Sequence, residues 1–128
     1  MINKALRIIF AFLLLSIIAA SVIDYSNIPS IGLSAEGGAG LGYHFWGYLI
    51  AAVLSWIAFR NHNAWVISII GLLLFVLGTG LEILQAYLPY RTFNPKDIAA
   101  NILGLGAGFL CILIWRSIQK FKESRIST

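Results

Sequence analysis

Residues 64–88, AWVISIIGLLLFVLGTGLEILQAYL, decide the fold class of this chain. The stretch matches a membrane-crossing helix, which needs roughly 20 predominantly apolar residues to cross a hydrocarbon core about 30 Å thick. Its single charged side chain is Glu82, and its single side-chain amide is Gln85. A carboxylate near the bilayer centre costs about 2.5 to 3.5 kcal/mol on insertion scales, so we expect Glu82 to have a partner, a proton or a wet cavity.

The composition of the whole chain agrees with this stretch. Of its 128 residues 59% are hydrophobic and 11% are charged, whereas about a quarter of the residues of a soluble domain are charged. Residues 5–23, 43–59 and 98–118 are also apolar and long enough to cross a bilayer. Together with residues 64–88 they predict an all-α integral membrane bundle of four transmembrane helices. This bundle forms a single domain over residues 1–128 and leaves no soluble domain.

The basic residues predict the orientation of the bundle. Arg91 and Lys96 follow the third predicted helix. The other seven of the nine Lys and Arg residues lie near the chain termini or in the turn between the second and third helices: Lys4, Arg7, Arg60, Arg116, Lys120, Lys122 and Arg125. Because cytoplasmic segments carry an excess of Lys and Arg, we expect both termini to be cytoplasmic. This scattered charge favours membrane lipids as partners and argues against nucleic acid, and we expect the tail 120–128 to be frayed or surface-bound.

The connections between the predicted helices differ in length. Residues 24–42 form a long loop whose second half is rich in glycine, which predicts a flexible outer segment or re-entrant turn. Residues 60–63 form a short turn, so the second and third helices should form an antiparallel hairpin. Before the fourth helix, Asn94 can cap, Pro95 fits the first helical position, and Asp97 suits the positive end of the helix dipole. Asp97 therefore has two interpretations, a capping carboxylate or a site residue.

Helical spacing and this topology bring polar residues to one end of the bundle. Glu82 and Gln85 are three residues apart and share a helix face, and Asp97 and Asn101 are four apart and share another. The third helix ends and the fourth begins at the same outer surface, where the second helix also begins. We therefore expect one ligand-binding site in the outer leaflet, formed by His44, Tyr48, Glu82, Gln85, Arg91, Asp97 and Asn101.

Two glycines in the fourth predicted helix have the spacing of a helix-packing motif. Gly104 and Gly108 are four residues apart, and small residues at this spacing let two membrane helices approach closely. We expect these glycines to pack against a neighbouring helix rather than to take part in chemistry.

These residues form a recognisable pattern: Glu82-x2-Gln85, then Arg91, then Asp97-x3-Asn101-x2-Gly104-x3-Gly108, with His44-Phe45 opening an earlier helix. The pattern resembles the VanZ-like family of small bacterial membrane proteins, named after a protein associated with resistance to the lipoglycopeptide teicoplanin. The resemblance is strongest over residues 43–109. It departs where relatives often carry an Asp-Lys pair before the histidine, because Gly40 and Leu41 stand there. The resemblance implies a multi-pass protein of the bacterial cytoplasmic membrane with a link to the cell envelope, and supplies no mechanism.

Three functions fit these observations. The first is binding of an amphiphile with a polar or anionic head, such as an envelope lipid precursor or a lipoglycopeptide antibiotic, with Arg91 suited to a phosphate or carboxylate. The second is an enzyme acting on a lipid head group, with His44, Glu82 and Asp97 as the candidate catalytic residues. The third is a structural or partner-binding protein, in which the polar residues fix the helix register and the face formed by Gly104 and Gly108 docks another helix. Because four helices enclose little space, a homo-oligomer or a membrane-protein partner is compatible with each function.

A metal site formed by His44, Glu82 and Asp97 is chemically allowed. However, each of these ligands comes from a different predicted helix, and no local spacing motif joins any two of them. From the sequence we therefore expect no metal and no cofactor.

Overall fold

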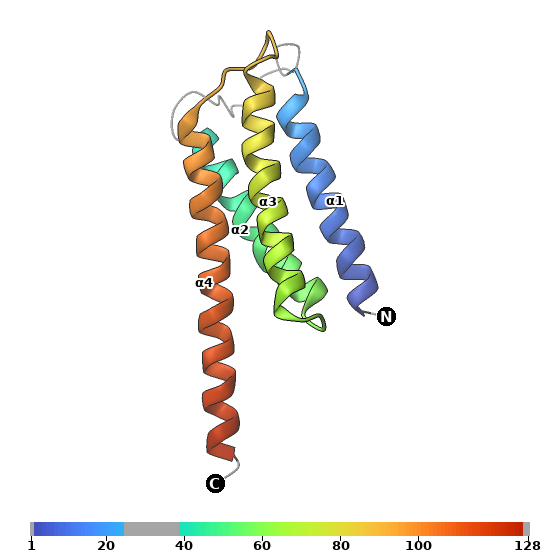
Figure 1. Ribbon diagram of the computed structural model, residues 1–128, viewed down its shortest axis with the longest axis vertical. Helices are drawn as coiled ribbons and strands as arrows, with labels where there is room; N and C mark the ends of the chain where they lie inside the picture. Colours follow the sequence, from blue (N-terminus) through green and yellow to red (C-terminus); the bar gives the residue numbers. More distant parts are fainter. Residues whose placement is uncertain (1, 25–38, 127–128) are drawn as a thin grey trace.

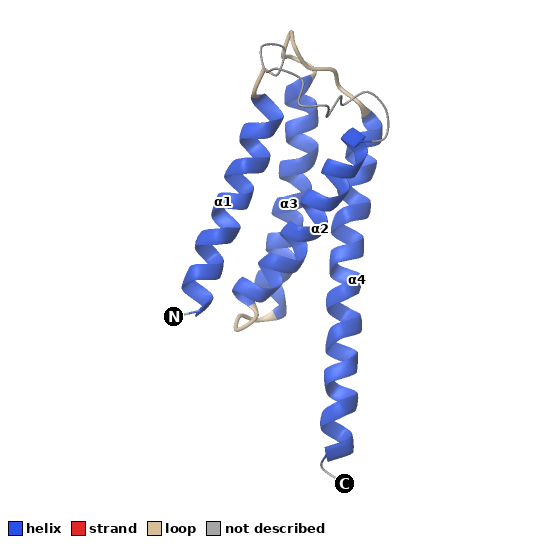
Figure 2. Cartoon of the chain, turned by 180° about the vertical axis from the view of Figure 1, so that it is seen from behind, coloured by secondary structure: helices blue, strands red, loops and turns tan. Residues whose placement is uncertain are grey.

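The structure, a computed structural model, describes residues 2–24 and 39–126. Within these residues the chain forms helices and no strand (Figures 1 and 2). The helices are α1 (Ile2–Val22), α2 (Ala39–Phe59), α3 (Ala64–Gln85) and α4 (Pro95–Ile126). All four are long and apolar enough to cross a membrane. The predicted all-α class with four apolar helices of membrane-spanning length is therefore confirmed.

The helices run up and down in one bundle, in which α2 packs most extensively on α4 and also contacts α1 and α3. The start of α1, the turn 60–63 and the end of α4 lie at the same end of the bundle (Figure 1). Residues 86–94 join α3 to α4 at the opposite end, which we call the connection end. The last part of α4 projects beyond the other helices (Figure 1).

The contact between α2 and α4 is close because both helices present small residues to it. On α2 the small residue at this contact is Ala52, which is completely buried. On α4, a Cβ atom added at Gly104 would overlap the carbonyl oxygen of Phe45, and one added at Gly108 would lie 2.7 Å from the Cβ of Ala52. The two backbones therefore pack at a distance that only glycine allows.

Larger apolar residues fill the interior and cover the outside of the bundle. The core contains Phe10, Tyr48, Ala51, Ala52, Leu74 and Leu105. Many large side chains point outward and are more than half exposed, among them Phe12, Leu15, Leu72, Leu73, Val76, Leu103 and Leu110. Soluble monomers rarely expose a continuous apolar patch of more than a few hundred Å². This outer surface therefore matches hydrocarbon better than water.

Three helix boundaries differ from the sequence-based expectation. The glycine-rich end of the first predicted loop is helical, since α2 begins at Ala39, whereas residues 25–38 lie outside the described part of the chain. The end of α3 at Gln85 precedes the predicted boundary by three residues, in line with the proline at position 89. The tail expected to fray is helical as far as Ile126, because it contains good helix formers and no glycine or proline.

Arg7 holds α1 against the α2–α3 hairpin at the end opposite the connection end. Its Nε donates to the carbonyl oxygen of Ala58 at 3.3 Å, and its terminal nitrogen lies 2.8 Å from Nε2 of His62. The guanidinium also lies 5.0 Å from the centre of the Phe59 ring. This arginine therefore fixes the end of α1 that lies farthest from the connection end.

We expect Gly104→Ala to destabilise the folded protein, because the added methyl group meets the backbone of α2 rather than a side chain that can turn away. Overpacking of this kind costs about 1 to 3 kcal/mol. Thermal unfolding in detergent measures the effect. Gly106→Ala is the matched control, since nothing lies within 4 Å of a Cβ at that position. Equal melting temperatures for the two variants would contradict the close α2–α4 contact.

Candidate functional site

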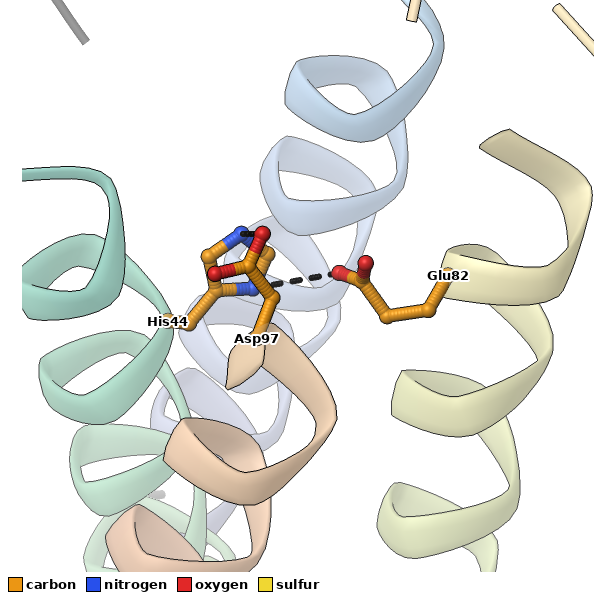
Figure 3. A group of neighbouring side chains, drawn as sticks. All are labelled: His44, Glu82 and Asp97. Atoms are coloured by element: carbon orange, nitrogen blue, oxygen red, sulfur yellow. Dashed lines mark ion pairs between the residues drawn. The ribbon is translucent and has the colours of Figure 1, made fainter. Parts of the chain in front are cut away.

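Side chains from three helices meet near the connection end of the bundle (Figure 3). His44 of α2 lies between the carboxylates of Glu82 on α3 and Asp97 on α4. Its Nδ1 is 3.4 Å from Oε1 of Glu82, and its Nε2 is 3.8 Å from Oδ2 of Asp97. Each side chain comes from a different helix, so the group forms only when the bundle is packed.

Asn101 completes this group and orients the imidazole. Its Oδ1 accepts a hydrogen bond from Nδ1 of His44 at 3.1 Å. An amide oxygen only accepts, so this bond requires a proton on Nδ1. When the ring is neutral, its lone pair is then on Nε2, which faces Asp97. We call His44, Glu82, Asp97 and Asn101 the histidine cluster.

The histidine cluster is closed toward the bundle interior and partly open at its edge. Glu82 is 1% exposed and Asn101 is 4% exposed. The side chains of His44 and Asp97 are 24% and 16% exposed. A small ligand or the head of a larger one can therefore reach His44 and Asp97, while Glu82 lies behind them.

Two buried oxygen atoms have no hydrogen-bond partner within the described residues: Oε2 of Glu82, inside the cluster, and the hydroxyl of Tyr48, next to it. Tyr48 lies one turn deeper on α2 than His44 and is 3% exposed. Its ring occupies space left by Gly78, where a Cβ would lie 2.8 Å from the hydroxyl. Because buried polar groups in native proteins almost always have partners, these atoms indicate unused binding capacity.

Asp97 lies at the start of α4, but Asn94 rather than Asp97 caps this helix. Asn94 caps α4, since its Oδ1 accepts from the backbone N–H of Lys96 at 3.1 Å. The Asn94 amide also donates to Oδ1 of Asp97 at 3.3 Å. The other carboxylate oxygen, Oδ2, faces His44. The start of α4 thus fixes the direction in which Asp97 presents its free oxygen.

A second polar group at the same end binds α1, and its Arg91 also acts as a positive charge on Glu82. Three side chains donate to backbone carbonyl oxygens in the last turn of α1: Gln85 to Ser21 at 3.1 Å, Tyr90 to Val22 at 3.0 Å, and Arg91 to Ala20. The last carbonyls of a helix have no partner within the helix and must find donors elsewhere. Gln85 and Arg91, placed in one ligand site by the sequence, therefore have a structural task here.

Sequence reasoning missed Tyr90 and the carbonyl oxygens of α1. The signal for them is weak, because a tyrosine in a short connection carries no motif. The last carbonyls of α1 do indicate that hydrogen-bond donors must lie nearby, since a membrane offers few other donors. Their donors could only be identified once α3 and α1 were seen side by side (Figure 1).

Comparisons of this chain with protein-family models, with curated proteins and with solved structures give no match. The geometry of the site therefore indicates which chemistry it can support. An imidazole, two carboxylates and an amide can accept hydrogen bonds from a polar ligand, exchange a proton with it, or bind a cation.

We expect Gln85→Leu to lower the stability of the folded protein by about 1 kcal/mol, because the buried bond to the Ser21 carbonyl is lost. Gln119→Leu is the matched control, since Gln119 is only partly buried and lies near the C-terminal end of α4 rather than near the end of α1. Thermal unfolding of both variants in the same detergent measures the difference. If the two substitutions lower the melting temperature equally, Gln85 does not hold α1.

Proposed function

We propose that this chain is a VanZ-like integral membrane protein of the bacterial cytoplasmic membrane, whose histidine cluster binds the polar head of an amphiphilic ligand. One observation carries the proposal: Glu82, 1% exposed within apolar helices, keeps an oxygen that accepts no hydrogen bond from the described residues. Ionisable residues inside membrane segments are rare and mark ligand or ion sites. The spacing of Glu82, Asp97 and Asn101 supports the family assignment.

The distribution of charge supports an orientation with the histidine cluster on the outer side. Seven of the nine basic residues belong to the start of α1, the turn 60–63 or the last part of α4, and these segments share one end of the bundle (Figure 1). By the positive-inside rule that end is cytoplasmic, which makes both chain termini cytoplasmic. The connection end is then extracytoplasmic, where envelope lipids and antibiotics are encountered.

The chemistry of the cluster defines the kind of head group. Two carboxylates and an amide oxygen accept hydrogen bonds, so hydroxyl and ammonium hydrogens suit them. The apolar side chains exposed around the bundle can lie against an acyl chain. An envelope lipid, its precursor or a lipoglycopeptide antibiotic combines these two parts, and the resemblance to the VanZ-like family adds a link to glycopeptide resistance.

The binding residues differ in part from those expected from the sequence. We assign the head group to His44 and Asp97 at the mouth of the cluster and to the buried Asn101 and Glu82 behind them. Tyr48 lies beneath the cluster and supplies its buried hydroxyl. Arg91 and Gln85 both donate to the end of α1, so we assign them to holding that helix.

A membrane enzyme acting on a lipid head group is the second candidate, and the position of His44 favours it. An imidazole held between carboxylates can act as a general base whose orientation is fixed by its neighbours. The two candidates differ in what becomes of the bound lipid. Binding leaves the lipid unchanged, whereas catalysis converts it to a product that accumulates with time.

We expect native mass spectrometry of the wild-type protein, released gently from bacterial membranes, to detect a retained polar-headed lipid. Asp97→Asn keeps the size of the side chain but removes its charge, and should reduce the retained fraction by about tenfold, since a hydrogen bond to a charged group contributes about 1.5 to 3 kcal/mol. Glu123→Gln is the matched control, because it removes an exposed carboxylate at the opposite end of α4.

Equal retention by the wild type and both variants would place the lipid elsewhere on the bundle. A wild type that retains no lipid, and that binds no added lipoglycopeptide, would exclude tight binding of either ligand. A product whose amount rises with incubation time would instead favour the enzyme.

A further inference from the structure

We propose that His44, Glu82 and Asp97 bind a divalent transition-metal ion, for which Zn²⁺ is the representative. One ligand atom from each residue, an imidazole nitrogen or a carboxylate oxygen, lies within 4.8 Å of the other two. Figure 3 shows the two carboxylates directed at the ring from different sides. The three residues come from three helices, so the packed bundle assembles a site that no local motif announces.

The distances suit a small cation. Ligand atoms of tetrahedral zinc lie about 2.0 to 2.2 Å from the metal, and therefore about 3.3 to 3.6 Å from one another. Nε2 of His44, the nitrogen that Asn101 leaves available, is 3.8 Å from Oδ2 of Asp97. Oε1 of Glu82 lies 3.4 Å from Nδ1 of the same ring, so the Glu82 side chain would have to turn toward Nε2 for all three residues to bind one ion.

The charges favour a dication at this place. Glu82 is 1% exposed and Asp97 is mostly buried, so two neighbouring carboxylates share an apolar surrounding. Each of them is costly to bury as an anion. The Arg91 guanidinium acts as a positive charge on Glu82, and a divalent cation would balance both carboxylates at once.

Two further groups match the surroundings of a bound metal. Metal-bound histidines usually donate their other ring N–H to an oxygen acceptor, which fixes the tautomer. Asn101 provides that acceptor for Nδ1 of His44 and leaves Nε2 for the metal. In addition, Oε2 of Glu82 is buried and has no hydrogen-bond partner within the described residues, so this oxygen is available to a cation.

The donor set selects among metals. Imidazole suits zinc, iron, copper and nickel, whereas magnesium and calcium prefer sites formed by oxygen alone. Three protein ligands leave one tetrahedral position open, as in zinc sites that bind a further ligand. The partly exposed edge formed by His44 and Asp97 gives access to that position. An oxygen of the lipid head group fits that position, and this part of the inference rests on the proposed function.

The test uses the full chain, purified in detergent with an affinity tag that contains no histidine and freed of metal with a chelator. Titration with Zn²⁺ against a coloured competing chelator gives stoichiometry and affinity. We expect one Zn²⁺ per chain, and at least about tenfold weaker binding for Glu82→Gln and for His44→Ala. Glu123→Gln and His62→Ala are the matched controls, and both should bind as the wild type does.

Visible absorption with Co²⁺ in place of Zn²⁺ gives a readout that needs no variant. Strong d–d bands in the wild-type protein indicate the predicted four-coordinate site, and Mg²⁺ in excess should not displace the metal. The proposal is overturned if the folded wild type takes up no stoichiometric Zn²⁺ and shows no such bands. It is equally overturned if His62→Ala loses the metal while His44→Ala keeps it.

Lipid retention separates this inference from the proposed function. Native mass spectra resolve the added mass of a metal from that of a lipid, with and without chelator treatment. Stoichiometric metal without any retained amphiphile supports the metal site and counts against head-group binding. A lipid retained by a protein that binds no metal has the opposite meaning.

Discussion

The close contact between α2 and α4 is the constraint on which the rest of the structure depends. Gly104 and Gly108 let the two backbones meet, and Gly104 lies next to the carbonyl of Phe45. That contact is one residue from His44 on α2 and three from Asn101 on α4. The bond between His44 and Asn101 is therefore a consequence of the glycines, because a larger residue at 104 would separate the helices before the side chains could meet.

The apolar surroundings impose a second constraint. Each polar group near the connection end needs a hydrogen-bond partner, a counter-charge or a ligand, because an unpaired polar group is costly there. Helix ends create part of that need, because the last carbonyls of α1 require donors. Gln85 and Arg91 meet this need. The histidine cluster has a different character, since Oε2 of Glu82 keeps capacity that no described protein group uses. Within one end of a small bundle, some polar residues close the structure and others remain available to a ligand.

Much of this arrangement could be predicted from the sequence, because it follows from helical period and segment length. The apolar stretches define four helices, and the spacing of Asp97 and Asn101 directs both to one face of α4. The direction of Gln85 could not be predicted. It shares a helix face with Glu82, yet it turns to α1, because that choice depends on which neighbour leaves a carbonyl unpaired. The helical start of α2 was missed because glycine-rich sequence favours loops in water more than in a membrane, where an unpaired backbone is costly.

Unused hydrogen-bonding capacity is what separates a binding site from a structural polar network. A network that only fixes helix register gains most when every member is satisfied, because an unpaired polar group in a low dielectric is destabilising. The α1 contacts of Gln85 follow that rule. Glu82 does not, although it is the most deeply buried charged residue of the described chain. Neighbouring groups add hydrogen-bond acceptors rather than donors for Glu82. Asp97 is a second carboxylate, and Asn101 accepts the Nδ1 proton of His44. Arg91 places a positive charge near Glu82, and a cation, a proton or a ligand with hydrogen-bond donors would stabilise the cluster further.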